Sequence, residues 1–214
     1  MENAEKFQNN GFIVVRNLLD PHLVKFLASY FRLAEGHFEG RFERDSTSLN
    51  AHGDACGDTV LYMLRTAIEA NTGLELLPTY SFTRMYRKGD QVGRHKDGKE
   101  NQVSCTICIE KDSDWPLGIS DGNEDFEVTL EPGDAVIYQG YALDHWRDKF
   151  AGERQVQLIV GYIEKGGKHD ARRFYGRGEP MYVPFGVKNP TPVRLLKGRL
   201  VRWRDKIIKR DRSF

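Results

Sequence analysis

The chain has 214 residues, of which 39% are hydrophobic and 29% charged, with a formal net charge of +1, a balance typical of a globular protein. A chain of this length can bury a proper core as a single domain. No apolar run approaches the length of a membrane helix, and residues 1–12 lack the basic start and apolar stretch of a secretory signal. We therefore expect a soluble, cytoplasmic protein.

The N-terminal part of the chain predicts a strand followed by a helix. Residues 11–19, GFIVVRNLL, are rich in the β-branched residues that favour strands. Asp20 before Pro21 is typical of a helix N-cap with proline at the first helical position. Apolar residues at helical spacing then continue over 22–36, where a glycine predicts the end of the helix.

A loop and a second helix are expected next. Residues 40–58 are polar and rich in glycine and aspartate, which predicts a loop. Asp58 is the expected N-cap of a helix that ends at Gly73.

Beyond Pro78 the hydrophobic period changes to two, as in strands. Alternation over 80–86 puts Tyr80, Phe82, Arg84 and Tyr86 on one face. Further short strands separated by turn residues are predicted at 102–110, 126–130, 134–140, 143–148 and 154–163. Two helices followed by a series of short strands predict a mainly β fold, a sandwich or barrel with flanking helices.

The three cysteines, Cys56, Cys105 and Cys108, follow no regular framework, and their odd number predicts free thiols in a reducing compartment. Cys105 and Cys108 form a C-x-x-C, but no second Cys or His pair completes a zinc site. On a strand they would lie on opposite faces, which favours buried structural thiols.

The segment VGRHKDG, residues 92–98, places His95 and Asp97 two residues apart between two glycines. The same His-x-acid spacing recurs in HGD at 52–54 and in HFE at 37–39. An isolated pair of this kind is more often a solvated turn than a metal site. The spacing alone therefore does not choose among the three pairs, and the rest of the sequence must do so.

Further candidates follow His95 and Asp97 along the chain. His145 lies 48 residues after Asp97, Arg154 opens a later predicted strand, and Tyr86 lies nine residues before His95. Two imidazoles and one carboxylate can bind one face of an octahedral Fe(II), which leaves three positions open for a bidentate 2-oxo acid and for dioxygen. An arginine fork and a tyrosine are suited to the distal carboxylate of such an acid.

This order of residues resembles the Fe(II)/2-oxoglutarate-dependent dioxygenases, particularly the prolyl-4-hydroxylase-like branch. The resemblance runs from about residue 11 to residue 163 and includes TRMYRKGDQVGRHKD, EPGDAVIYQG and DHWRDKFAGERQVQLIVGYI. It implies a double-stranded β-helix, a jelly-roll or cupin-like barrel. The site residues that it implies are the iron ligands His95, Asp97 and His145, and Tyr86 and Arg154 for 2-oxoglutarate.

The resemblance also favours residues 95–97 over the rival pairs. The pair at 52–54 lies before a helix with no tyrosine strand behind it, and the pair at 37–39 lies near a helix end. We expect both pairs in surface loops.

More than one arginine is a candidate for binding 2-oxoglutarate. By strand alternation Arg154 shares a face with Val156, Leu158 and Val160, an apolar set suited to a barrel interior. Arg147 shares a face with His145, and Arg84 shares one with Tyr86, so either is an alternative, and we expect Arg84 in the same pocket. Aromatic residues assigned to the core or the pocket rim, with no chemistry, are Trp115, Tyr138 and Trp146.

The charge is unevenly distributed. Residues 187–214 contain ten Lys/Arg and two Asp, so 10 − 2 = +8, which leaves +1 − 8 = −7 for residues 1–186. We expect an oxygenase domain over 1–186 and a basic amphipathic helix in 187–214. Its apolar stripe has spacings of three and four residues, at Val193, Leu196, Leu200, Trp203 and Ile207. Such a helix either docks on the barrel or binds nucleic acid, a membrane surface or a protein partner.

The expected reaction is hydroxylation of a C–H bond, coupled to conversion of 2-oxoglutarate and O2 to succinate and CO2. The resemblance favours a prolyl or other residue of a protein or peptide as the substrate, and a small molecule is the alternative. An AlkB-like nucleic-acid demethylase fits the basic tail, but that group has an R-x5-R pattern and the residue six after Arg154 is Val160. A non-catalytic cupin-type binding module is the alternative of another class. The sequence leaves the oligomeric state open.

Overall fold

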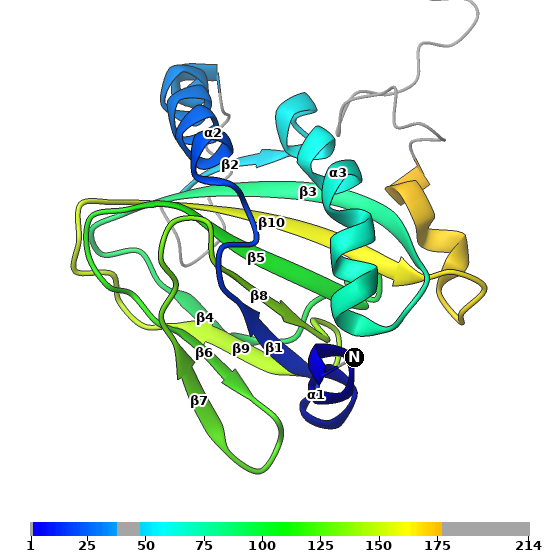
Figure 1. Cartoon of the computed structure of the whole chain (residues 1–214). Helices are drawn as coiled ribbons and strands as arrows, with labels where there is room; N and C mark the ends of the chain where they lie inside the picture. The colour runs from blue at the N-terminus through cyan, green and yellow to red at the C-terminus, as the bar shows by residue number, and fades with distance from the viewer. Residues whose placement is uncertain (1, 38–47, 177–214) are drawn as a thin grey trace, which may run out of the picture.

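The computed structural model describes residues 2–37 and 48–176, in which short strands form two antiparallel sheets (Figure 1). The strands are β1 (Phe12–Val15), β2 (Leu49–His52), β3 (Leu76–Arg87), β4 (Val92–His95), β5 (Val103–Lys111), β6 (Leu117–Ser120), β7 (Asp125–Val128), β8 (Ala135–Tyr138), β9 (Asp144–Arg147) and β10 (Arg154–Glu164). One sheet has the order β1-β8-β5-β10-β3-β2 and the other β4-β9-β6-β7. The expected mainly β fold with flanking helices is confirmed.

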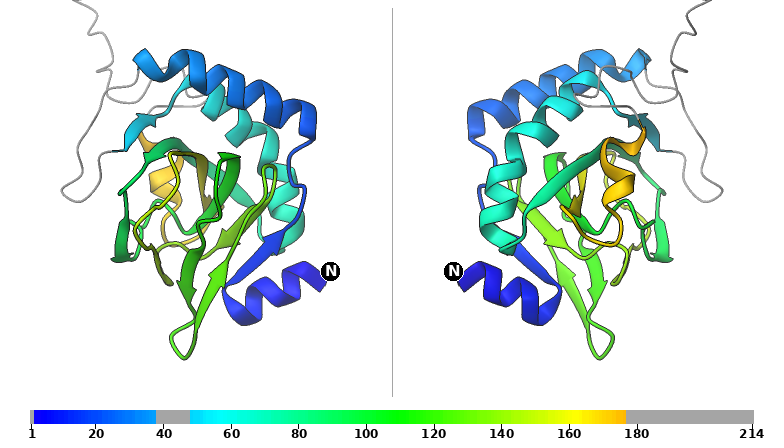
Figure 2. Two further views of the ribbon diagram at one scale, coloured as in Figure 1. Left: turned by 90° about the vertical axis from the view of Figure 1, so that its left-hand side faces the viewer. Right: turned by 90° about the vertical axis from the view of Figure 1, so that its right-hand side faces the viewer.

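The three α-helices of the described residues lie on one face of the six-stranded sheet (Figure 2). They are α1 (Glu2–Asn10), α2 (Pro21–Ala34) and α3 (Ala55–Thr72), with short 3-10 helices at Glu35–His37 and Asp170–Gly176. Figure 2 shows α2 and α3 along the outer side of the sheet, so that its inner face looks toward the four-stranded sheet. The sequence did not predict α1, because its residues are nearly all polar and only Phe7 is buried. In the described ranges no helix is long and apolar enough to cross a membrane.

The two larger apolar clusters of the core lie on opposite faces of the large sheet. On the outer face, alternate residues of β10, including Leu158 and Val160, pack with Leu27 of α2 and Leu61 of α3. The inner face contributes to a second cluster between the sheets, which contains Leu117, Ile119, Val136 and Tyr138. The central strands are therefore buried on both faces. Burial of each aliphatic side chain stabilises the fold by roughly 1.5–3 kcal/mol.

The cysteines lie as the sequence predicted. All three are free, and Cys105 belongs to the helix-facing cluster whereas Cys108 belongs to the cluster between the sheets. Burial raises the pKa of Cys108 to about 11, which keeps the thiol protonated and inert near neutral pH.

The start of α3 differs from the prediction. The N-cap is Asp54, whose carboxylate accepts hydrogen bonds from the backbone N–H groups of Cys56 and Gly57. Asp58 lies in the first turn instead and accepts from the Ser81 hydroxyl, and residues 49–52, expected in a loop, form β2. Gly57 obscured the first turn in the sequence because glycine is a poor helix former. It is needed there, since a Cβ would lie 2.7 Å from the Ser81 Oγ.

Asp54→Ala should lower the free energy of unfolding by about 0.5–2 kcal/mol, because two backbone donors lose their cap. The Tyr30 hydroxyl, which donates to Asp54 Oδ1 over 2.7 Å, loses its acceptor as well. A thermal melt should show Tm lower by roughly 1–8 °C. Asp114→Ala, which removes an exposed carboxylate, is the control and should leave Tm nearly unchanged. Equal melts for the two variants would contradict the assigned cap.

Candidate metal centre

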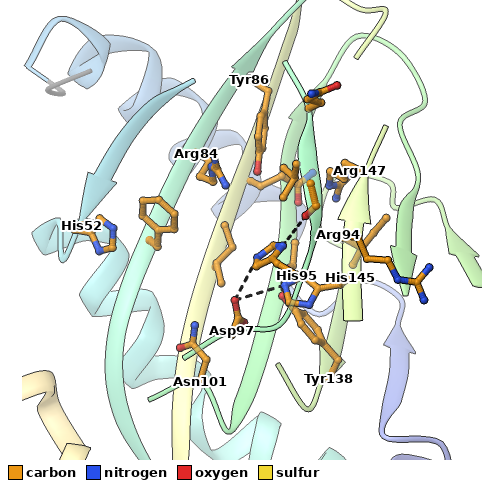
Figure 3. A pocket seen from close by; sticks show the side chains of 18 of the residues that line it. His52, Arg84, Tyr86, Arg94, His95, Asp97, Asn101, Tyr138, His145 and Arg147 are labelled. Atoms are coloured by element: carbon orange, nitrogen blue, oxygen red, sulfur yellow. Dashed lines mark hydrogen bonds and ion pairs between the residues drawn. The ribbon is translucent and has the colours of Figure 1, made fainter. Parts of the chain in front are cut away.

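Three side chains from the four-stranded sheet and the loop after β4 converge at one point (Figure 3). His95 ends β4 and is paired in register with His145 of β9, so the two imidazoles are neighbours on one face. Asp97 follows β4 by two residues and is held close because its N–H donates to the Gly140 carbonyl over 2.8 Å. One ligand atom from each of the three residues lies within 4.8 Å of the others.

The ligand atoms point toward each other. Asp97 Oδ1 lies 3.5 Å from His145 Nε2 and 3.7 Å from His95 Nε2. Each Nδ1 faces a backbone carbonyl, for His95 that of Gly93 at 2.8 Å and for His145 that of Leu143 at 3.1 Å. A carbonyl oxygen only accepts, so Nδ1 is the donor in both contacts, and Nε2 is the ring nitrogen that each histidine directs toward Asp97 and a metal.

The electrostatics also suit a cation. Burial opposes ionisation of Asp97, but the neighbouring His145 and a hydrogen bond from Ser104 outweigh it, so the pKa of Asp97 is below its usual value. The carboxylate is thus charged near neutral pH. Two imidazoles and one carboxylate on one side of a point fit an octahedral divalent metal of the iron type. The His95 side chain is 43% exposed, so the side of the candidate metal position away from these three residues is open to the pocket.

A cavity of about 490 Å³ lies between the two sheets and contains all three candidate ligands in its wall. Its volume is within the usual range of small-molecule sites. The six-stranded sheet contributes the inward-facing residues of β3 and β10, and the four-stranded sheet contributes β4 and β9.

A buried arginine forms part of the pocket wall. Arg147 follows His145 by two residues on β9, so both side chains point inward, and it is only 4% exposed. Its guanidinium lies 4.8 Å from the centroid of the Trp115 ring and donates to the Trp115 carbonyl. Among the described residues no carboxylate forms an ion pair with Arg147, and burial lowers its pKa. A buried cation without a counter-ion is costly, and the cost falls when an anion binds.

Arg84 and Tyr86, both predicted for the cosubstrate, lie on the inner face of β3 and line the same pocket. The Arg84 guanidinium lies 5.1 Å from the centroid of the Tyr86 ring and donates to the Ser48 hydroxyl over 3.3 Å. Tyr86 packs edge-on against Trp115 with centroids 4.8 Å apart. The structure thus brings these two residues to the same cavity as Arg147.

Arg154 lies elsewhere. It is absent from the pocket wall, and its guanidinium is paired with Glu35 at 2.6 Å and Glu110 at 3.3 Å. Strand alternation correctly grouped Arg154 with Val156 and Leu158, but that face packs on the helices. The inner face of β10 carries Gln157 and Ile159 instead. Periodicity of two shows which residues share a face but not which face lines the cavity.

The rival pair of His52 and Asp54 is not part of a metal cluster among the described residues. His52 ends β2 and lines the pocket, but its ring packs on Phe82 with centroids 4.0 Å apart, and Asp54 caps α3. His37 lies in a 3-10 helix, and Glu39 lies outside the described residues. The basic helix expected in 187–214 is outside them as well.

Tyr138 lies in the pocket wall, in agreement with its expected place in the core or at the pocket rim, whereas the sequence did not predict Gln157 there. Tyr138 packs edge-on against His145 with centroids 4.9 Å apart, and its hydroxyl lies 3.3 Å from the Thr106 hydroxyl. Gln157 is buried in the pocket wall, where its side-chain amide interacts with the Cys108 thiol. The signal for Gln157 was the polar alternation in RQVQLIV, which places an amide opposite the apolar face.

No family model and no curated protein matches the sequence. Among solved structures, a prolyl-4-hydroxylase from Pseudomonas putida matches with a TM-score of 0.63 and 19% identity over 77% of this chain and 98% of its own. A 2OG-Fe(II) oxygenase family protein from Burkholderia pseudomallei matches with a TM-score of 0.62 and 13% identity over 79% and 92%. HygX from Streptomyces hygroscopicus, with nickel, 2-oxoglutarate and hygromycin B bound, matches with a TM-score of 0.61 and 12% identity over 77% and 87%. The chain therefore has the double-stranded β-helix fold of these proteins, as predicted.

Proposed function

We propose that the protein is an Fe(II)- and 2-oxoglutarate-dependent oxygenase that hydroxylates a C–H bond. The observation that carries the proposal is the convergence of two Nε2 atoms and one carboxylate oxygen, from His95, His145 and Asp97, on the wall of a pocket with a buried arginine. Bound there, Fe(II) would supply oxidative decarboxylation of 2-oxoglutarate by O2, giving succinate and CO2 and a hydroxylated product. The fold is shared with 2-oxoglutarate oxygenases, which supports the assignment.

Arg147 is our proposed anchor for the distal carboxylate of 2-oxoglutarate, in place of Arg154. It is buried, has no carboxylate partner among the described residues, and points inward from the same strand as His145. Its planar fork can donate two parallel hydrogen bonds to a carboxylate. Tyr86 and Arg84 would complete this part of the wall, with Tyr86 positioned by Trp115.

For the second substrate we propose a prolyl or other residue of a protein or peptide, or a small molecule with an apolar ring. The support is an aromatic wall formed by His52, Tyr80 and Phe82 in the pocket that contains the candidate metal ligands. Flat apolar faces of this kind pack well against saturated or aromatic rings. The AlkB-like alternative is not supported at Val160, which stands where the second arginine of the R-x5-R pattern would be and is buried toward the helices.

The test is an anaerobic titration. Adding Fe(II) and then 2-oxoglutarate should produce a weak visible charge-transfer absorption that needs both components, and admitting O2 should produce succinate. The absorption should be absent with succinate in place of 2-oxoglutarate. A chain that binds Fe(II) but gives neither the absorption nor succinate would be better described as a cupin-type binding module.

A further inference from the structure

The two oxygens of the Asp97 carboxylate have different surroundings. Oδ1 is the atom that faces both imidazole Nε2 atoms. Oδ2 points the other way and accepts a hydrogen bond from the Ser104 hydroxyl over 2.8 Å. Ser104 lies on the central strand β5 and is fully buried. The Ser104 hydroxyl therefore fixes the rotation of the Asp97 carboxylate about the Cβ–Cγ bond.

A glycine in the turn after β8 makes room for this hydrogen bond. A Cβ at Gly140 would lie 2.4 Å from Asp97 Oδ2 and 2.5 Å from Ser104 Oγ. It would also lie 3.0 Å from the Asn101 carbonyl oxygen, which is backbone and cannot rotate away. The backbone of Gly140 is not in the left-handed region, so glycine is needed at this position for space and not for conformation.

From these contacts we infer that Ser104 and Gly140 are positioning residues that make Asp97 a one-oxygen metal ligand, an inference that rests on the metal centre of the proposed function. A carboxylate that was free to turn would present either oxygen, or both together. Binding through both oxygens would take one of the positions that a bidentate oxo acid and dioxygen require. Hydrogen bonds to ligand side chains commonly change metal affinity by 10- to 100-fold.

The experiment measures Co(II) binding to the metal-free protein. Ser104→Ala should raise the Co(II) dissociation constant by roughly 10- to 100-fold and change the visible spectrum of the bound Co(II). The matched control is Ser81→Ala, because the buried Ser81 hydroxyl also donates to an aspartate oxygen over 2.8 Å, that of Asp58, away from the pocket. The control should bind Co(II) with wild-type affinity and spectrum, even if its melting temperature falls as far as that of Ser104→Ala.

Gly140→Ala tests the same contact by placing a methyl group against the Asp97–Ser104 hydrogen bond. The substitution lies in a turn and not in the centre of the sheet. It should weaken Co(II) binding as Ser104→Ala does, and it decides the question if Ser104→Ala does not fold. Wild-type Co(II) affinity and spectrum in either folded variant would overturn the inference. Because the measurement is metal binding, a wild-type protein that binds Co(II) but never consumes 2-oxoglutarate would refute the proposed reaction and leave this inference standing.

Discussion

Replacing His145 by alanine should abolish metal-dependent 2-oxoglutarate turnover while the protein stays folded, and His95→Ala and Asp97→Ala should do the same. Each variant leaves two ligands, which hold a divalent metal too weakly to gather the cosubstrate and dioxygen. All three side chains line a cavity, so their loss removes little packing from the core. Succinate formation measures the turnover, and circular dichroism with a thermal melt measures the fold.

The control for these variants is His22→Ala, which removes an exposed imidazole from the first turn of α2. It should keep wild-type turnover. Metal-dependent turnover that persisted in His145→Ala would show that the metal centre lies elsewhere.

Arg147→Ala should raise the KM for 2-oxoglutarate by roughly 30- to 1,000-fold. The loss of a charge-assisted pair that leaves a buried carboxylate without its partner costs on the order of 2–4 kcal/mol, at about 1.4 kcal/mol per tenfold change. Metal affinity should change little, because Arg147 contacts Trp115 and none of the three ligands. Steady-state kinetics against 2-oxoglutarate and a separate Co(II) titration distinguish the two effects.

Arg154→Ala provides the comparison for this prediction. This substitution also removes an arginine side chain from a strand. The Arg154 side chain, however, lies on the face that packs on the helices, where it pairs with Glu35 and Glu110. We expect lower stability and an unchanged KM. If Arg154→Ala gave the large rise in KM and Arg147→Ala did not, the anchor would have to be reassigned to Arg154.

The contrast between these two arginines shows where sequence reasoning reached its limit. Alternation identified the residues that share a face with Arg154, but β10 is a central strand buried on both sides. Its apolar face meets the helices, and its face with Gln157 meets the cavity. Only the packing of a second layer distinguishes the two. For His95 and His145, by contrast, the resemblance to a known family implied that they are neighbours, and the structure pairs them in register.

Local signals succeeded where one interaction dominated and failed where several competed. The N-cap at Asp20 followed directly from Asp-Pro and is present. The N-cap at Asp54 was missed because Gly57 weakens the first turn, and the strand at 49–52 was missed because its conformation depends on pairing with β3. The Ser104–Gly140 contact joins residues far apart in sequence, so no local pattern could reveal it.

The adjacency of His145 and Arg147 on β9 has a consequence for which substrates the pocket can come to accept. One two-residue repeat of a strand, about 6–7 Å, separates them, so the strand itself sets the spacing between the proposed metal ligand and the proposed carboxylate anchor. If both roles hold, we expect an oxo acid with a shorter or longer carbon chain to match the two ends less well. The aromatic wall of His52, Tyr80 and Phe82 belongs to the other sheet. We therefore expect mutations that reshape that wall to change the preference for the second substrate and to leave this spacing, and with it the preference among oxo acids, unchanged.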